Sequence, residues 1–294
     1  MKKLLVIFFV CLFIINVNAQ YPTIKGVSVQ VEFDKRIRAW DGFGFNYVET
    51  AQTPDYKEFS QEYGGFSLLN DRQKSEIIDM VFGEDGLKVG LVKMFCDPFH
   101  QAEAGGPYND TTTTKYMREF VRMGLDKTRS RGGDLNIITT LYGPPSYMTL
   151  QKKIRGRDLD PEHKGDLAAY MVEWVRFLRE KEHFPVNYLS LHNEGEDWTR
   201  WPWDGSDPNI GHGHDYNMWW TPSLVAEMIK VTHDSLVAGG MGDVGVTPGE
   251  TSNWYRFSYW GYSDAVSEDP EAVKDLGLIT SHGFFNGTYG RWFG

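Results

Sequence analysis

The sequence predicts an α/β fold, a parallel (β/α)8 TIM barrel. From about residue 42 to residue 281, short apolar runs of strand length alternate with amphipathic segments of helix length. This alternation predicts parallel strands joined by right-handed crossovers. Long segments follow the strands at residues 95, 142, 192 and 247, as in a barrel whose pocket lies at the carboxyl ends of its strands. The sequence has no glycine-rich dinucleotide-binding loop after an early strand, and such a loop would have favoured an open doubly wound sheet.

The expected barrel strands are fewer than a closed barrel requires. They lie at about residues 42–47, 89–95, 135–142, 188–192, 243–247 and 276–281. Closure of a β/α barrel takes eight strands. We therefore expect a barrel that is truncated after its sixth strand, as in a fragment of a longer reading frame, or one that closes in a different way. Residues 27–33 alternate between apolar and polar side chains, which predicts a further half-buried strand without an evident partner.

Helix-start signals occur between the predicted strands. Asn70 or Asp71 is expected to cap one helix, and Thr221 followed by Pro222 is expected to begin another. Apolar side chains recur at helical spacing in the intervening segments. These segments are residues 113–129 and 166–182, and a short helix is expected from Pro270.

The first residues predict a secretory signal peptide. Lys2 and Lys3 precede an apolar run at residues 4–15, and residues 17–19 resemble a small-x-Ala cleavage site. The run is shorter than the roughly 20 residues that cross a bilayer, which disfavours a membrane anchor. We expect a secreted or periplasmic protein. Its parts are a signal peptide (1–19), an N-terminal strand of a side β-domain (20–40) and an incomplete barrel (41–294).

Charge and composition disfavour several classes of partner. The chain has a net charge of −10, and loss of Lys2 and Lys3 with the signal peptide makes it −12. An acidic protein of this kind is not expected to bind nucleic acid or an anionic membrane. Only Cys96 follows the signal peptide, so a disulfide framework is not expected. We expect no cofactor and no metal, because residues 212–215 (His-Gly-His-Asp) lack a third ligand at fixed spacing.

The strongest candidates for chemistry follow the fourth predicted strand. Asn193 and Glu194 end the run, and the loop after them is rich in tryptophan and acidic residues, beginning with Trp198. Glycoside cleavage requires a proton-donating carboxyl group and a second carboxylate, and indole rings stack on sugar rings. We interpret Glu194 as a catalytic acid/base whose pKa is raised by burial and by a neighbouring nucleophile. Asn193 would bond the sugar's 2-hydroxyl. The alternative is an ordinary surface Asn-Glu pair.

Other strand ends supply candidates for substrate binding. They are Asn46, Asp97, Tyr142, Glu250, Trp254 and His282. Tyr142, or Tyr147 beyond a Gly-Pro-Pro turn, is interpreted as part of a rigid rim. Glu250 is a second carboxylate, a binding residue or a structural acid, and His282 binds substrate, orients a carboxylate or belongs to the core.

These motifs in this order resemble glycoside hydrolase family 30, including its endo-β-1,6-galactanase-like members. Residues 41–44 resemble the family's opening Asp-Gly-Phe-Gly strand, and residues 143–148 are similar to its Ser-Pro-Pro-x-Trp-Met turn. Residues 192–195 resemble its Gln-Asn-Glu-Pro motif, and residues 248–250 are similar to its Pro-Glu motif. His282-Gly283 matches the end of its sixth strand.

The resemblance implies a retaining, endo-β-glycanase-like hydrolase of polysaccharide or oligosaccharide. It implies Glu194 as acid/base and a glutamate nucleophile at the end of a seventh strand, a position that no residue of this chain matches. It also implies a side β-sandwich that includes residues 27–33. The preferred substrates would be β-galactan, β-glucan and xylan, in that order. The alternative function is a non-catalytic carbohydrate-binding protein on a degenerate or truncated barrel. Residues 20–294 expressed alone are expected to be poorly soluble and inactive.

Overall fold

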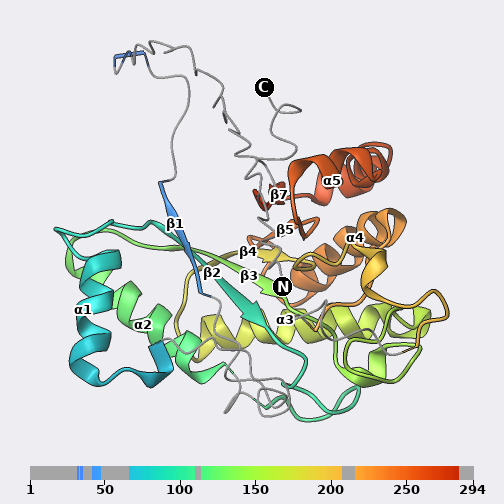
Figure 1. Cartoon of the computed structure of the whole chain (residues 1–294), viewed down its shortest axis with the longest axis horizontal. Helices are drawn as coiled ribbons and strands as arrows, with labels where there is room; N and C mark the ends of the chain where they lie inside the picture. The colour runs from blue at the N-terminus through green and yellow to red at the C-terminus, as the bar shows by residue number, and fades with distance from the viewer. Residues whose placement is uncertain are drawn as a thin grey trace, which may run out of the picture. The chain divides into compact units, whose positions relative to one another are not determined.

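A computed structural model describes residues 42–47, 66–109, 114–206 and 216–284, together with Glu32, Asp34 and Lys35. The chain forms two compact units, Met1–Trp40 and Asp41–Gly294. In the first unit, Lys35 pairs with Glu32 at 2.5 Å. The predicted signal peptide and almost all of the predicted strand at 27–33 lie outside the described residues. The fold and the site described below belong to the second unit (Figure 1).

The second unit contains a parallel sheet with the strand order β1-β2-β3-β4-β5. Its strands are β1 (Gly44–Asn46), β2 (Leu91–Cys96), β3 (Asn136–Leu141), β4 (Val186–Ser190) and β5 (Gly245–Thr247). Val92 pairs with Ile137, and Leu189 pairs with Val246. These four side chains are fully buried. The central strands are apolar along most of their length because parallel strands in β/α folds are covered on both faces.

A kink at Pro248 and Gly249 separates the five-stranded sheet from a second, two-stranded sheet. Pro248 and Gly249 separate β5 from β6 (Glu250–Thr251), and β6 pairs in parallel with β7 (Thr280–Ser281). Parallel bridges join Asn193 to Glu250 and Val246 to Leu276. The first five predicted strands are therefore confirmed as one parallel sheet, and the sixth is represented by β7 in the second, two-stranded sheet. The last strand is shorter than the predicted 276–281.

The four main helices are α1 (Asp71–Phe82), α2 (Lys115–Ser130), α3 (Lys164–Glu180) and α4 (Pro222–Ala238). Two of them, α1 and α4, begin at the predicted caps, and α2 and α3 each begin within two residues of the predicted ranges. The Asn70 side chain accepts a hydrogen bond from the Gln73 N–H, and the Gln73 side chain accepts one from the Asn70 N–H, which is a capping box. Thr221 accepts from the Leu224 N–H, with Pro222 in the first turn of α4.

The β6–β7 connection contains three short helices. They are α5 (Trp254–Tyr259), α6 (Tyr262–Ser267) and α7 (Pro270–Asp275). The sequence predicted only the helix that begins at Pro270. The other two were missed because six residues are too few to show a helical repeat. Asn253 caps α5 by accepting from the Arg256 N–H, and Gly261, with φ of +86°, separates α5 from α6.

The helices pack on the sheet through large buried side chains. Trp174 of α3 is fully buried, and its indole N–H donates to the Thr139 hydroxyl of β3 at 2.6 Å.

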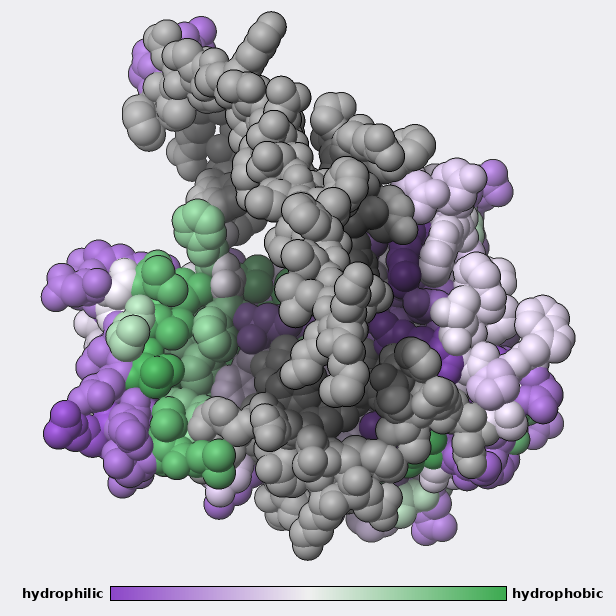
Figure 2. Space-filling model, in the orientation of Figure 1, coloured by the Kyte–Doolittle hydropathy of each residue, from purple (hydrophilic) through white to green (hydrophobic). Residues whose placement is uncertain are grey.

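Hydrophobic side chains also reach the surface around β1, α1 and α2 (Figure 2). Within the described ranges, none of the helices has the length and apolar character needed to span a membrane.

Candidate active site

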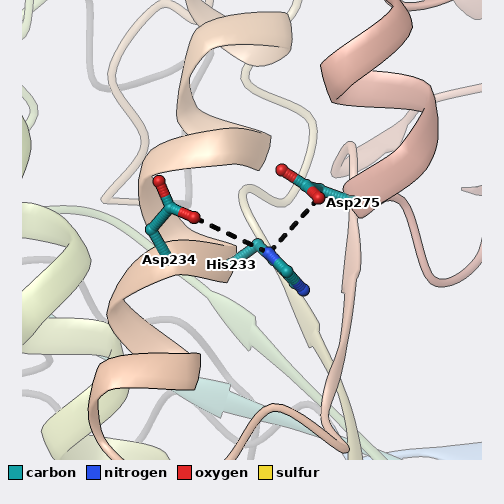
Figure 3. Close-up of side chains that lie close together, drawn as sticks. All are labelled: His233, Asp234 and Asp275. Carbon is teal, nitrogen blue, oxygen red and sulfur yellow. Dashed lines mark ion pairs between the residues drawn. The ribbon is translucent and has the colours of Figure 1, made fainter.

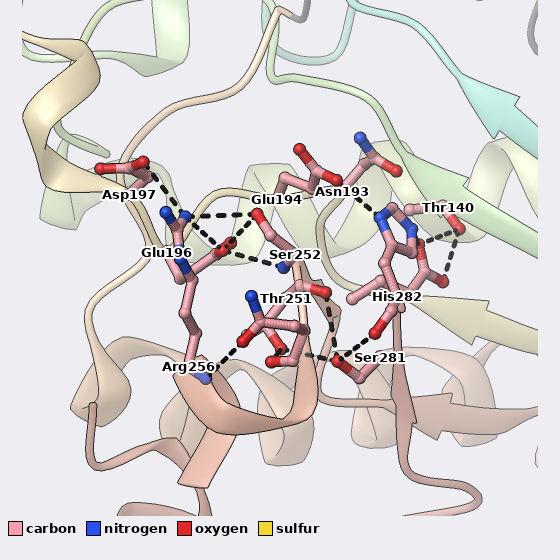
Figure 4. Close-up of polar contacts among 12 residues, drawn as sticks. Thr140, Asn193, Glu194, Glu196, Asp197, Thr251, Ser252, Arg256, Ser281 and His282 are labelled. Carbon is pink, nitrogen blue, oxygen red and sulfur yellow. Dashed lines mark hydrogen bonds and ion pairs between the residues drawn. The ribbon is translucent and has the colours of Figure 1, made fainter. Parts of the chain in front are cut away.

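Polar side chains converge where β4, β6 and β7 end (Figure 4). Glu194 lies four residues beyond β4, and its backbone N–H donates to the Glu250 carbonyl at 2.7 Å. Its φ of 52° is in the left-handed region, which costs a residue with a Cβ about 1–2 kcal/mol. The bridge to β6 holds this backbone in place. The strand ends therefore fix the direction in which the Glu194 side chain points.

The Glu194 carboxylate bonds to two nitrogen groups. Its Oε1 lies 2.7 Å from His282 Nδ1, and its Oε2 accepts from the Arg200 guanidinium at 2.9 Å. Burial by itself would raise the Glu194 pKa, but His282 and Arg200 outweigh burial and hold this pKa below its ordinary value. The increase expected from burial is therefore outweighed in this structure, and the increase expected from a neighbouring nucleophile stays a prediction. The ionised form of Glu194 is favoured.

A buried lysine connects this carboxylate to the five-stranded sheet. Lys93 of β2 donates from Nζ to Asn193 Oδ1 at 2.8 Å, and Nζ lies 2.5 Å from Glu250 Oε2 and 3.2 Å from His282 Nε2. An ammonium group has three hydrogens to donate, and here it has three acceptors. If Nε2 accepts from Lys93, the His282 proton is on Nδ1, where it is donated to Glu194.

The Lys93 bond also orients the Asn193 amide. Because Lys93 donates to Oδ1, the other polar atom of the side chain is the Nδ2 donor. The Nδ2 group can therefore donate a hydrogen bond to the oxygen of a sugar hydroxyl group. The Asn193 carbonyl in turn accepts a hydrogen bond from the Asn217 side chain. Asn193 is thus fixed at its side chain and its backbone.

Glu250 is held inside the same network. The Thr140 hydroxyl lies 3.0 and 3.2 Å from its two carboxylate oxygens, and Lys93 pairs with one of them. The side chain of Glu250 is only 5% exposed. Glu250 therefore acts as a structural partner of Lys93 in this structure. Sequence reasoning missed Lys93 and Thr140, although a lysine within an otherwise apolar strand was a signal for the first.

Glu196 belongs to a second polar cluster. Its Oε1 accepts from the Ser252 N–H at 2.8 Å, from the Ser252 hydroxyl at 2.7 Å and from Arg256 at 3.0 Å. Arg256 also pairs with Asp197 at 3.1 Å. The Glu196 side chain is fully buried. This cluster attaches the loop after β4 to α5.

Tyr142, Asp97 and Asn46 lie in different environments. Tyr142 is 5% exposed and packs against Phe95, with ring centroids 4.7 Å apart. Asp97 is buried and accepts from the Phe99 N–H at 3.0 Å within its own loop. Asn46 is exposed and pairs with Lys93 in the β1–β2 register. A role of these three residues in substrate binding stays a prediction, and Tyr142 and Asp97 would first have to become accessible.

Two predicted aromatic residues are accessible. Trp198 in the 3₁₀ turn η6 (Trp198–Arg200) is 44% exposed, and Trp254 at the start of α5 is 41% exposed. Trp198 packs against Trp260, with ring centroids 5.1 Å apart. Arg200 in the same turn bonds to Glu194. Trp198 is thus only two residues away in sequence from Arg200, which bonds to the candidate catalytic carboxylate.

One further cluster among the described residues has the composition of a metal site. It consists of His233 and Asp234 of α4 and Asp275 of α7, whose ligand atoms all lie within 4.8 Å of one another (Figure 3). His233 Nδ1 lies 3.4 Å from Asp275 and 3.9 Å from Asp234. The Asp234 side chain is 82% exposed. These contacts are typical of a surface ion-pair cluster that joins two helices.

Comparison with known proteins connects this fold to carbohydrate-active enzymes. The sequence matches no protein-family model and no curated protein. Solved structures do match. The GH30 xylanase C catalytic domain from Talaromyces cellulolyticus aligns with a TM-score of 0.61 at 14% identity, over 84% of this chain and 54% of its own. SrfJ from Salmonella typhimurium aligns with a TM-score of 0.60 at 13% identity, over 83% and 51%.

A third match is a conserved exported protein from Bacteroides fragilis, with a TM-score of 0.61 at 15% identity, over 87% of this chain and 55% of its own. The chain thus spans about half the length of these structures. At such low identity the likeness shows the fold, which is that of the β/α-barrel glycosidases. The predicted resemblance to glycoside hydrolase family 30 is confirmed as a likeness of structure.

Proposed function

We propose that this chain carries the acid/base side of the active site of a secreted, retaining β-glycan hydrolase. The single observation that carries the proposal is the placement of Glu194. It lies at the carboxyl end of a barrel strand, bonded to His282 and Arg200 and adjacent to the oriented amide of Asn193. Barrel enzymes position their catalytic groups in this way.

In the proposed reaction, protonated Glu194 donates its proton to the glycosidic oxygen while the bond from that oxygen to the anomeric carbon breaks. A second carboxylate forms a bond to the anomeric carbon. Water then attacks this carbon, gives its proton back to Glu194 and releases the carboxylate. The His282 N–H and the Arg200 guanidinium stabilise the ionised Glu194 that exists between the two steps.

The second carboxylate is proposed to come from the part of the barrel that the matched structures contain and this chain does not cover. Glu250 is a poor candidate because Thr140 and Lys93 engage its oxygens inside the barrel. Glu196 is fully buried against Ser252 and Arg256. A negative nucleophile close to Glu194 would raise the Glu194 pKa, which proton donation requires and which the described part of the chain does not provide.

One observation favours a second candidate function, a carbohydrate-binding protein without catalysis. His282 and Arg200 lower the Glu194 pKa. A permanently ionised carboxylate bonds sugar hydroxyls but donates no proton. Reading the gene beyond Gly294 separates the two functions. A strand that ends in glutamate within roughly one β/α unit, on the order of 30 residues, supports the hydrolase, and an apolar strand without an acid supports the binding protein.

The test of the hydrolase is Glu194→Gln in the full-length protein. We expect loss of nearly all activity on polysaccharides and on glycosides with poor leaving groups, because these need protonation of the departing oxygen. Glu227→Gln on α4, which removes a partly exposed carboxylate paired with Lys164, is the matched control. Screening on β-galactan, β-glucan and xylan identifies the substrate. Unchanged turnover by the Gln variant would remove Glu194 from the mechanism.

A further inference from the structure

A pocket of about 250 Å³ lies between the loop that follows β3 and the loop that follows β4. We refer to it as the tryptophan pocket, and its lining residues are Arg157, Trp198, Trp201, Pro202, Trp203 and Trp219. Indole faces are the surfaces on which the apolar faces of sugar rings stack. The volume suits a single sugar ring better than a longer segment of glycan.

Hydrogen bonds to backbone carbonyl groups link the residues that line the tryptophan pocket. The Arg157 guanidinium donates to the Pro202 and Trp203 carbonyls, and the Trp219 N–H donates to the Arg157 carbonyl at 2.7 Å. The Trp201 indole N–H donates to the Arg155 carbonyl at 2.7 Å, and Trp201 is only 6% exposed. These bonds hold the pocket open before a ligand arrives, which lowers the entropy cost of binding.

The charge of the tryptophan pocket suits a neutral ligand. Arg157 is the charged residue in its lining, and the Arg157 Nε bonds to both carboxylate oxygens of Asp158 at 2.8 and 2.9 Å. The pair leaves little net charge to attract a uronate or a phosphate. A neutral pyranose, which needs apolar stacking and hydrogen-bond partners, fits this environment.

Trp198 connects the tryptophan pocket to the candidate active site. It lines the pocket, and on the same 3₁₀ turn Arg200 bonds to Glu194 at 2.9 Å. Trp198 also packs against Trp260, and the Arg256 guanidinium lies 4.5 Å from the centroid of the Trp260 ring. Aromatic surface therefore extends from the pocket toward α5, past the turn that contacts Glu194.

We propose that the tryptophan pocket is a subsite for one neutral pyranose unit of a polymeric substrate, at a position removed from the bond that is cleaved. The inference rests on the proposed function for the location of that bond, and it adds a second position at which the substrate is held. A substrate held both at Glu194 and in this pocket extends over several sugar units.

The test uses the full-length protein with Glu194→Gln, so that ligand is not consumed. Isothermal titration calorimetry measures affinity for β-1,6-galacto-, cello- and xylo-oligosaccharides of one to six units. We expect affinity to rise with length in at least one series. Trp203→Ala should lower the affinity for the longest members about tenfold, the loss of one stacking contact, and leave the shortest unchanged. Trp203 is 86% exposed, so its truncation does not disturb the core.

Tyr259→Ala is the matched control, because Tyr259 is 73% exposed on α5 and is not among the pocket-lining residues. Equal affinity of the Trp203 variant and its parent at every length would overturn the subsite, and so would absence of binding in all three series. Failure of the proposed function is distinguishable. In that case the protein without the Glu194 substitution hydrolyses none of these glycans, while Trp203-dependent binding persists.

Discussion

Lys93 places a positive charge in the buried part of the candidate site, where its ammonium group meets Asn193, Glu250 and His282. Lys93 itself is 8% exposed. A buried ion pair of this kind adds little stability compared with an apolar pair, but removal of one partner leaves an uncompensated charge. The network is therefore better explained by the geometry it imposes on the candidate site than by its contribution to stability.

This argument predicts the effect of Lys93→Met. The substitution leaves the Glu250 carboxylate buried without its cation, and we expect a loss of about 3–5 kcal/mol in the free energy of unfolding. The double variant Lys93→Met, Glu250→Gln should recover part of that loss, because the remaining partner is then neutral. Denaturant unfolding of both variants measures the coupling. A double variant that is less stable than the single variant would contradict this account.

Glu194 predicts a pH dependence. Burial alone would raise the Glu194 pKa, but His282 and Arg200 outweigh burial and hold this pKa below the ordinary 4.5. At pH values above 4.5, the ionised form of Glu194 therefore stabilises the folded state. Around and below pH 4.5 the unfolded chain binds more protons than the folded chain, and the stabilisation is lost as pH falls through the lowered pKa. The stability of the protein relative to Glu194→Gln should thus be constant above about pH 5 and decrease below it. A difference that changes between pH 5 and 7 would indicate a raised pKa.

At the scale of elements, local signals predicted more than long-range ones. The caps at Asn70 and Thr221 were predictable because each bonds to a backbone N–H three residues away. The strand order followed from the alternation of strands and helices. The contacts of Lys93 with Asn193 and His282, 100 and 189 residues apart in sequence, depend on the register of several strands, which no local pattern encodes.

The candidate site was therefore predicted only in part. The position of Glu194 at a strand end followed from the sequence, and contact with a carboxylate was one of three roles considered for His282. The choice of Glu194 as that carboxylate, the bond from Arg200 and the sign of the Glu194 pKa shift required the fold. Burial of Tyr142 could not be predicted either. In parallel strands that are apolar on both faces, alternation no longer shows which way a side chain points.

The kink between β5 and β6 predicts a large effect of Gly249→Ala. Gly249 has φ of +99°, and a Cβ added there would lie 2.3 Å from Cδ2 of His192, which is buried and whose pKa burial lowers to about 3. We expect a loss of about 2–4 kcal/mol in unfolding free energy, from backbone strain and overpacking together. Displacement of β6 would also disturb Glu194, since Glu194 N–H donates to the Glu250 carbonyl.

Gly240→Ala is the matched control for this prediction. Gly240 has a comparable φ of +75°, but nothing lies within 4 Å of its added Cβ. Its substitution carries only the backbone cost of about 1–2 kcal/mol. Denaturant unfolding of both variants separates strain from collision. Equal losses would mean that the His192 side chain moves aside and that the kink does not depend on glycine for space.

At the scale of the whole molecule, the edge strands of the two sheets are the features that most favour aggregation. Among the described residues, β1 pairs only with β2, and β7 pairs only with β6. Phe43, immediately before β1, is 73% exposed, and Leu68 and Leu87 are exposed to a similar extent. Figure 2 shows hydrophobic side chains gathered around β1, α1 and α2. An unprotected strand edge beside apolar surface is a template for association with other chains.

We therefore expect residues 20–294, expressed alone, to be mainly insoluble, with a broad thermal transition in the soluble remainder. Phe43→Lys should increase the soluble fraction severalfold, because a charge next to an edge strand opposes pairing with another chain. The control Leu150→Lys introduces the same charge at a side chain that is 53% exposed in the loop after β3, and it should have little effect. Sedimentation and calorimetry of the three proteins provide the test. A soluble monomer with one cooperative transition would show that β1 is protected, and the neighbours of β1 would then have to be sought in residues 1–41 or 48–65.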